Sequence, residues 1–118
     1  MKIPPYTEVL TESFREDFAV VGEYIIDSNV EAGNDVEFAI EKAEQFEKEV
    51  RDLIKDLTLF PEQGTIKATS AVRGKPVYDG RYSIRWVVNH DAREVSLIAI
   101  HDNERPKELR YGQAMSDV

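Results

Sequence analysis

The chain of 118 residues has a net charge of −8 and contains no cysteine. Its length predicts one domain, residues 1–118, which can bury about two thirds of the surface that the unfolded chain exposes. The lack of cysteine excludes disulfides, thiolate metal sites and cysteine nucleophiles. The first residues, MKIPPYTEVL, lack the apolar core of a signal peptide, and no apolar run approaches the roughly 20 residues that span a bilayer. We therefore expect a soluble cytoplasmic protein with no membrane partner.

The charge is unevenly distributed along the chain. Residues 1–60 carry 6 basic and 15 acidic side chains, whereas residues 61–111 carry 9 basic and 7 acidic ones. A globally acidic protein is repelled by nucleic acid at long range, so contact with RNA or DNA would require a local basic face. The acidic half also fits the solvated faces of amphipathic helices.

The N-terminal quarter predicts a strand and then a helix. Residues Tyr6–Thr11 are β-prone and partly alternating, which is typical of a short strand. Ser13 precedes Glu16 at the spacing of a capping box. Apolar residues then recur every three or four positions, at Phe14, Phe18, Val21 and Ile25. This period predicts an amphipathic helix of about four turns.

A second, longer helix is predicted after the break "SNVEAGND". Asn34 and Asp35 are available as caps, and Pro61 ends the helical pattern. One apolar face continues for about six turns through Ile40, Ala43, Phe46, Val50, Leu53 or Ile54, and Leu57. The two helices are expected to form an antiparallel hairpin because the loop between them is short.

After the turn "FPEQGT" the apolar period changes from 3.6 to 2, which indicates strands. Residues 66–72 are predicted as one strand, and "VRGKPVYDG" as a turn-rich connection. Residues 82–88 alternate apolar and polar side chains, "NHDARE" reads as a hairpin loop, and the apolar run 95–100 predicts a central strand covered on both sides. A short C-terminal helix is expected from Pro106 to Ala114.

This order of elements predicts an α+β fold. An N-terminal strand and a long antiparallel helical hairpin would pack with a mainly antiparallel four-stranded sheet, the hairpin covering one face of that sheet. Trp86 and Tyr82 are expected in the core beneath the hairpin.

The sequence resembles the RelE/ParE superfamily of toxins from bacterial type II toxin-antitoxin systems. The resemblance rests on a long second helix that ends in Leu59–Gly64 (LFPEQG), on the pattern Tyr-x-Ile-x-Trp at Tyr82–Trp86, and on an apolar strand that ends at His101. It covers residues 6–111, and it implies a small toxin domain that a cognate antitoxin neutralises within a hetero-oligomer.

The resemblance implies two different activities. RelE-like members cleave mRNA on the ribosome, and ParE-like members poison DNA gyrase. The helical hairpin and the position of His101 look ParE-like, whereas Arg105 and Tyr111, spaced as Arg-x5-Tyr, look RelE-like. However, Ser83 stands where RelE-like enzymes carry an arginine, and Lys75 alone stands near the place of their paired lysines.

In a RelE-like nuclease the catalytic candidates would be Arg105, Tyr111 and His101. RNA cleavage through the 2′-hydroxyl needs a base, an acid and cations around the phosphate, and Tyr111 or His101 could handle the protons. The cations predicted to bind a phosphate or a target are Arg73, Lys75, Arg81 and Arg85.

The residue patterns also suggest limits on this chemistry. Arg81 and Arg85, four positions apart, are expected on one face of their strand, where they could equally pair with acidic side chains. His90 is expected in a solvent-facing loop. No third ligand stands at a suitable spacing from the two histidines, so no metal and no cofactor are expected.

The leading hypothesis is a ParE-like toxin that inhibits growth through DNA gyrase. The alternatives are a metal-independent, RelE-like ribosome-dependent mRNA endoribonuclease, and a non-toxic protein-interaction module that keeps the fold.

Overall fold

The computed structural model describes residues 4–66 and 71–104. In this part of the chain the elements are β1 (Thr7–Leu10), α1 (Glu12–Glu31), α2 (Val36–Leu59), β2 (Thr65–Ile66), β3 (Arg73–Val77), β4 (Tyr82–Asn89) and β5 (Glu94–Asp102). The C-terminal helix expected from Pro106 to Ala114 lies outside the described residues.

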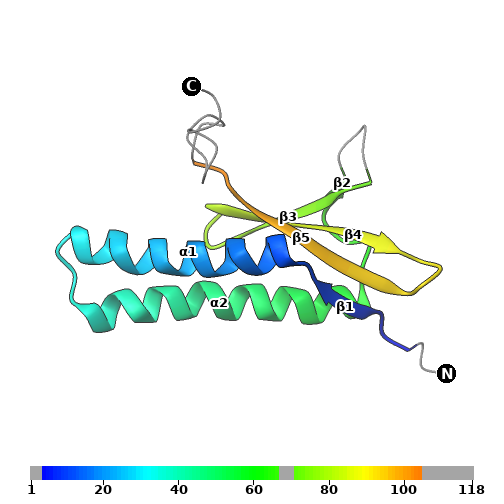
Figure 1. Ribbon diagram of the computed structural model, residues 1–118, viewed down its shortest axis with the longest axis horizontal. Coiled ribbons are helices and arrows are strands. Elements are labelled where there is room, and N and C mark those ends of the chain that lie inside the picture. The colour runs from blue at the N-terminus through cyan, green and yellow to red at the C-terminus, as the bar shows by residue number, and fades with distance from the viewer. Residues whose placement is uncertain (1–3, 67–70, 105–118) are drawn as a thin grey trace.

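The strands form one sheet in the order β1-β5-β4-β3-β2. β1 runs parallel to β5, and the other neighbours pair antiparallel. The two helices lie antiparallel on the same side of this sheet (Figure 1). The α+β fold with a helical hairpin on a mainly antiparallel sheet is therefore confirmed. The sheet has five strands where four were expected, and neither described helix has an apolar stretch that could cross a bilayer.

The region between α2 and β4 accounts for the fifth strand. Of the strand predicted over residues 66–72, Ile66 lies in β2, residues 67–70 lie outside the described residues, and Ala71 and Val72 are not in a strand. β3 occupies Arg73–Val77, where a turn was expected. The sequence pattern does not predict β3 because this strand contains Gly74 and Pro76, and both residue types are rare inside strands. Pro76 is tolerated because β2 pairs with Arg73 and Gly74 alone, so β3 forms the edge of the sheet beyond them.

Both helices begin at capping side chains. Thr11, and not Ser13, caps α1, because its hydroxyl accepts a hydrogen bond from the Phe14 N–H at 3.2 Å. The same hydroxyl donates to the Leu97 carbonyl at 2.8 Å and so ties the start of α1 to β5. Asp35 caps α2 as predicted, with its carboxylate accepting from the Phe38 N–H at 2.8 Å.

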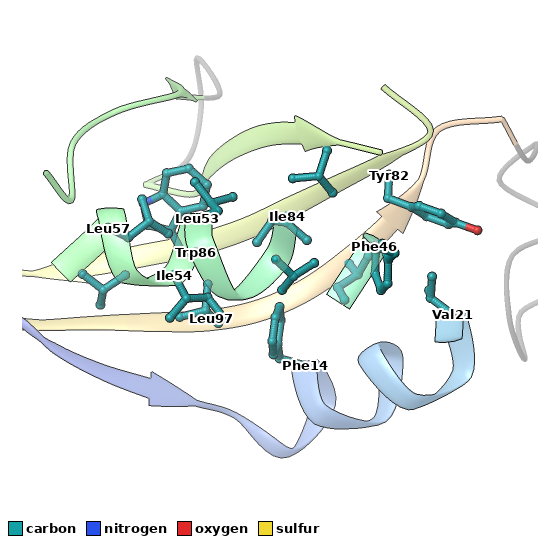
Figure 2. Close-up of a cluster of buried hydrophobic side chains, with 14 of the residues drawn as sticks. Phe14, Val21, Phe46, Leu53, Ile54, Leu57, Tyr82, Ile84, Trp86 and Leu97 are labelled. Atoms are coloured by element: carbon teal, nitrogen blue, oxygen red, sulfur yellow. The ribbon is translucent and has the colours of Figure 1, made fainter. Parts of the chain in front are cut away.

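The hydrophobic core lies between the hairpin and the sheet (Figure 2). Trp86 is fully buried and Tyr82 nearly so, which confirms their predicted place beneath the hairpin. Phe46 is fully buried on the predicted apolar face of α2. The Trp86 indole N–H donates to the Pro61 carbonyl at 2.9 Å, so burial of the ring leaves its donor satisfied.

The predicted apolar face of α2 needs one correction at its N-terminal end. Ile40 is 42% exposed, whereas Ala39 is fully buried. This end of the hairpin extends beyond the sheet in Figure 1, so an apolar side chain there has less to pack against.

The prediction that β5 is covered on both faces is also wrong for the described residues. Trp86 pairs with Leu97 and Arg85 pairs with Ala99, so Ile98 is the extra residue of a β-bulge. The bulge shifts the alternation, and β5 therefore reads as a continuous apolar run although the helices cover one face. On the covered face, the Asp17 carboxylate of α1 accepts from the Ile100 N–H at 2.9 Å.

The exposed edge of β3 is capped at its end. Tyr78 directly follows β3, and its N–H donates to the Glu49 carboxylate of α2 at 2.7 Å. Tyr78 and Asp79 then adopt left-handed conformations with φ values of 55° and 54°, which turn the chain into β4.

Candidate functional site

The sheet face turned away from α1 and α2, called the uncovered face because no described helix lies on it, contains a shallow groove of about 290 Å³ beside β3 and β4. Arg85 and Ser83 of β4 line it together with Gly74 and Pro76 of β3, which are their partners in the strand register. Paired residues project to the same face of a sheet. Because Gly74 has no side chain and Pro76 has a short one, space remains beside the Arg85 guanidinium.

His101 also belongs to this uncovered face. It pairs with Ser83 in the register of β4 and β5 and is partly exposed. The Ser83 hydroxyl is held by the side chain of Asn103, whose amide nitrogen donates to it at 2.8 Å. The structure thus places Arg85 and His101 on one face, and both are neighbours of Ser83. Arg85 lies two residues further along β4, and His101 lies opposite Ser83 on β5.

Arg73 and Lys75 contribute to the groove lining, but their side chains reach the opposite side of the sheet. Arg73 pairs with Trp86 in the register, and Trp86 faces the helices. The Arg73 guanidinium donates to the Glu62 carbonyl at 2.6 Å, and the Lys75 ammonium donates to the Gln63 side chain at 2.8 Å. Both cations therefore fix the loop after α2.

Arg81 lies in the turn before β4, so the expectation that it shares a strand face with Arg85 is wrong. Its guanidinium makes two hydrogen bonds to the Asp102 carboxylate, at 3.0 and 3.2 Å, and lies 5.5 Å from the ring centre of Tyr24 on α1. Asp102 is 1% exposed. The hydrogen bonds to Asp102 raise the pKa of Arg81 above its usual value, although partial burial of the guanidinium acts in the opposite direction. This pair closes the end of the sheet.

Arg105 and Tyr111, the two remaining catalytic candidates, lie outside the described residues. Their roles remain predictions. Of the seven candidate residues, the structure brings Arg85 and His101 together on the uncovered face, and it engages Arg73, Lys75 and Arg81 elsewhere. Within residues 4–66 and 71–104 no group of three or more histidine and carboxylate side chains is arranged to hold a metal ion.

A second candidate surface, absent from the sequence analysis, is an apolar cleft of about 160 Å³ between the helices. Phe14 and Phe18 of α1 line it with Val50 and Ile54 of α2, next to Leu10 at the end of β1.

Two cations border this cleft, Arg15 of α1 and Arg51 of α2. Arg15 is the sole basic residue of α1. Both side chains are largely exposed, although Arg15 donates to the Leu10 carbonyl and Arg51 lies 4.0 Å from Glu47. An apolar cleft with a basic rim thus interrupts an otherwise acidic hairpin. The helical period predicted the apolar residues, but the opening between the helices depends on their packing.

Comparison with known proteins agrees with this architecture. The sequence matches no protein-family model and no curated protein sequence. Solved structures do match. The chromosomal ParDE toxin-antitoxin system of P. aeruginosa aligns with a TM-score of 0.61 at 19% identity, over 84% of this chain and 97% of that one. The isolated RelE toxin of E. coli aligns with a TM-score of 0.56 at 11% identity, over 95% and 97%.

The intact E. coli RelBE toxin-antitoxin complex also aligns, with a TM-score of 0.50 at 12% identity, over 85% of this chain and 99% of that one. The chain therefore has the RelE/ParE toxin fold. At these identities the likeness concerns the fold, and it does not separate the RelE structures from the ParE structures.

Proposed function

We propose that this protein is the toxin of a type II toxin-antitoxin module and that it inhibits growth in the ParE manner, by acting on DNA gyrase in the cytoplasm. The RelE/ParE fold supports the toxin class. A module of this kind could serve plasmid stabilization. The protein would be held inactive in a hetero-oligomer with its antitoxin.

The observation that carries the ParE-like assignment is the separation of the predicted cations. RNA cleavage requires several positive groups around one phosphate. Arg73, Lys75 and Arg81 are instead bonded to a loop carbonyl, a loop amide and a buried carboxylate. Among the predicted cations within residues 4–66 and 71–104, Arg85 alone lines the groove from the uncovered face. The net charge of −8 further opposes docking on ribosomal RNA.

The apolar cleft is the surface that we propose for the antitoxin. Its lining can accept one or two large apolar side chains, and Arg15 and Arg51 would pair with carboxylates on either side of them. The fitting segment is an acidic amphipathic helix. Reversing both charges, Arg15→Glu with Arg51→Glu, should weaken neutralisation by the co-expressed antitoxin, whereas Lys48→Glu on the exposed surface of α2 should not.

One observation favours a RelE-like ribonuclease as the second candidate. Arg85 and His101 lie on the same uncovered face, and the chain continues from there toward Arg105 and Tyr111. A cation, an imidazole and a phenol could then surround one phosphate, and such an enzyme would need no metal.

Three assays separate these functions. We expect overproduction to slow growth of a bacterial host, co-expression of the adjacent reading frame to restore it, and the purified protein to inhibit supercoiling by gyrase. Arg85→Ala should weaken that inhibition more than the control Lys55→Ala on α2. Cleavage of mRNA on purified ribosomes would establish the RelE-like activity instead. Unimpaired growth at high soluble expression would favour the non-toxic interaction module.

A further inference from the structure

Three segments that are distant in the sequence meet at the end of the sheet opposite the Arg81 turn. They are the residues before β1, the loop between α2 and β2, and the hairpin loop between β4 and β5. Tyr6, Glu62 and His90 come from these three segments in turn. None of them belongs to the surfaces described above.

The three side chains lie in a row, with a hydrogen bond between Tyr6 and His90 and a closely placed carboxylate of Glu62, which also lies 3.7 Å from the Arg73 guanidinium. The Tyr6 hydroxyl lies 2.7 Å from Nδ1 of His90, and Nε2 of His90 lies 3.3 Å from a carboxylate oxygen of Glu62. In a neutral imidazole one nitrogen accepts and the other donates. The tautomer that accepts from the phenol at Nδ1 carries its proton on Nε2, the nitrogen that faces the Glu62 carboxylate. This is the order of a nucleophile, a base and a group that orients the base.

An arginine completes the cluster. The Arg93 guanidinium lies 4.4 Å from the ring centre of Tyr6 and donates to the Pro4 carbonyl. Arg93 has a φ of 53°, a left-handed conformation that is unfavourable for a long side chain. Such conformations persist where the surroundings enforce them, and they are concentrated at functional sites. The cation thus lies against the aromatic face of Tyr6.

The backbone holds this arrangement in place. The Tyr6 N–H donates to the Thr58 carbonyl at 2.7 Å, and the Thr7 N–H donates to the Arg93 carbonyl at 2.8 Å. The backbone that carries the phenol is therefore held by the end of α2 and by the loop before β5. The phenol is partly exposed, and His90 and Glu62 are exposed enough to leave room for a small reagent.

We propose that Tyr6, His90 and Glu62 form a nucleophilic site, in which the Tyr6 phenol accepts a phosphoryl-type group from an electrophile with an acidic leaving group. Tyr6 is the nucleophile, His90 is the general base, and Glu62 is a positioning residue. The Arg93 guanidinium suits an electrophile whose phosphoryl oxygens are negatively polarised.

The step is a substitution at phosphorus. The Tyr6 oxygen forms the new O–P bond, the bond from phosphorus to the leaving group breaks, and the leaving group departs with its electron pair. The phenolic proton moves to Nδ1 of His90, and from there to solvent. The product is a phosphorylated Tyr6, and no oxidant or metal is required.

Diisopropyl fluorophosphate is a suitable probe, since fluoride is the leaving group. Labelling of the whole protein would be followed by mass spectrometry with peptide mapping. Tyr24 is the internal reference, because it is also partly exposed and also has an arginine, Arg81, over its ring. We expect Tyr6 to be labelled at least about ten-fold faster than Tyr24, a modest effect for general-base assistance.

Two variants test the assigned roles. His90→Gln should reduce the rate at Tyr6 to near that of Tyr24 and leave Tyr24 unchanged. Glu62→Gln should lower the rate at Tyr6 but should have no further effect in the His90→Gln background, which a purely structural contact would not do.

Equal labelling of Tyr6 and Tyr24, or an unchanged Tyr6 rate in His90→Gln, would overturn the proposal. Circular dichroism of each variant shows whether it is folded; should His90→Gln unfold, the Tyr6-to-Tyr24 ratio in the wild type decides alone. Toxicity, gyrase inhibition and ribosomal cleavage play no part in these measurements. Failure of the nucleophilic site is therefore distinguishable from failure of the proposed toxin function.

Discussion

Replacing Arg81 by alanine removes the cation that faces a carboxylate with 1% exposure, and we expect it to lower the free energy of unfolding by roughly 2–4 kcal/mol. Breaking a buried ion pair typically costs about 3–5 kcal/mol, because one charge stays buried without its counter-ion. The lower range applies here since the Arg81 side chain is 25% exposed and water reaches part of the pair.

The partner substitution should cost less. Asp102→Ala leaves a partly exposed guanidinium that water can solvate, and it loses the two hydrogen bonds from Arg81 and one from the Glu104 N–H. Each hydrogen bond to a charged group contributes about 1.5–3 kcal/mol, but water replaces those that the exposed guanidinium loses, so we expect a loss of roughly 1–3 kcal/mol. The double variant should be less destabilised than the sum of the two, with a coupling energy of about 1–3 kcal/mol.

Urea unfolding followed by tryptophan fluorescence measures these quantities, since Trp86 is the sole tryptophan and is fully buried. The matched control is Lys48→Ala, because Lys48 and Asp52 pair at 2.8 Å with both side chains mainly exposed, and no measurable change is expected there. A loss below about 1 kcal/mol for Arg81→Ala, or additive effects in the double variant, would mean that burial does not strengthen this pair.

Other substitutions test the core, the electrostatics and a tight turn. Phe46→Ala and Trp86→Ala should each cost roughly 3–5 kcal/mol in urea unfolding, and a loss under about 1 kcal/mol would mean that the side chain faces solvent. Burial raises the pKa of Asp17 more than its hydrogen bond from Ile100 lowers it, so the folded state binds this proton more tightly than the unfolded state. The stability that Asp17 contributes is thus present at low pH and is lost as pH rises through its folded pKa. Asp17→Asn keeps an oxygen for the Ile100 N–H. Its free energy of unfolding, relative to that of the wild type, should therefore be higher at about pH 7 than at about pH 4, and an equal difference at both pH values would contradict this sign. Gly64→Ala should cost at least about 2 kcal/mol of unfolding free energy, because φ is +80° and a Cβ would lie 2.6 Å from a backbone oxygen; near-neutral stability would show that the turn can relax.

The sequence predicted the elements whose pattern is local. The apolar period located α1 and α2, and the alternation from Tyr82 located β4, because both patterns reflect burial of one face. It missed β3 because strand formation at Gly74 and Pro76 is imposed by pairing with β4, against their own preferences. It misplaced the start of α1 because Ser13 and Thr11 are both good caps, and the contact of Thr11 with β5 decides between them.

The candidate site was less predictable than the fold. Arg73, Lys75 and Arg81 were predicted, with Arg85, to bind a phosphate or a target, but alternation along β3 and the turn before β4 direct these three cations to different partners. Conversely, Tyr6 and His90 are 84 residues apart, and no local signal links them. Chemistry that depends on segments brought together by the sheet is visible only once the strand order is known.

The capped edge of β3 limits how copies of this protein can associate. An open strand edge invites a second chain to extend the sheet, which leads to domain swapping or fibrous aggregates. Here Pro76 offers no N–H, the N–H of Tyr78 is already occupied by Glu49, and β2 pairs with two residues of β3. Molecules crowded together during overproduction therefore find little backbone to pair with along β3. A second chain that extends this sheet would therefore have to pair with β1 or β2, the two outer strands.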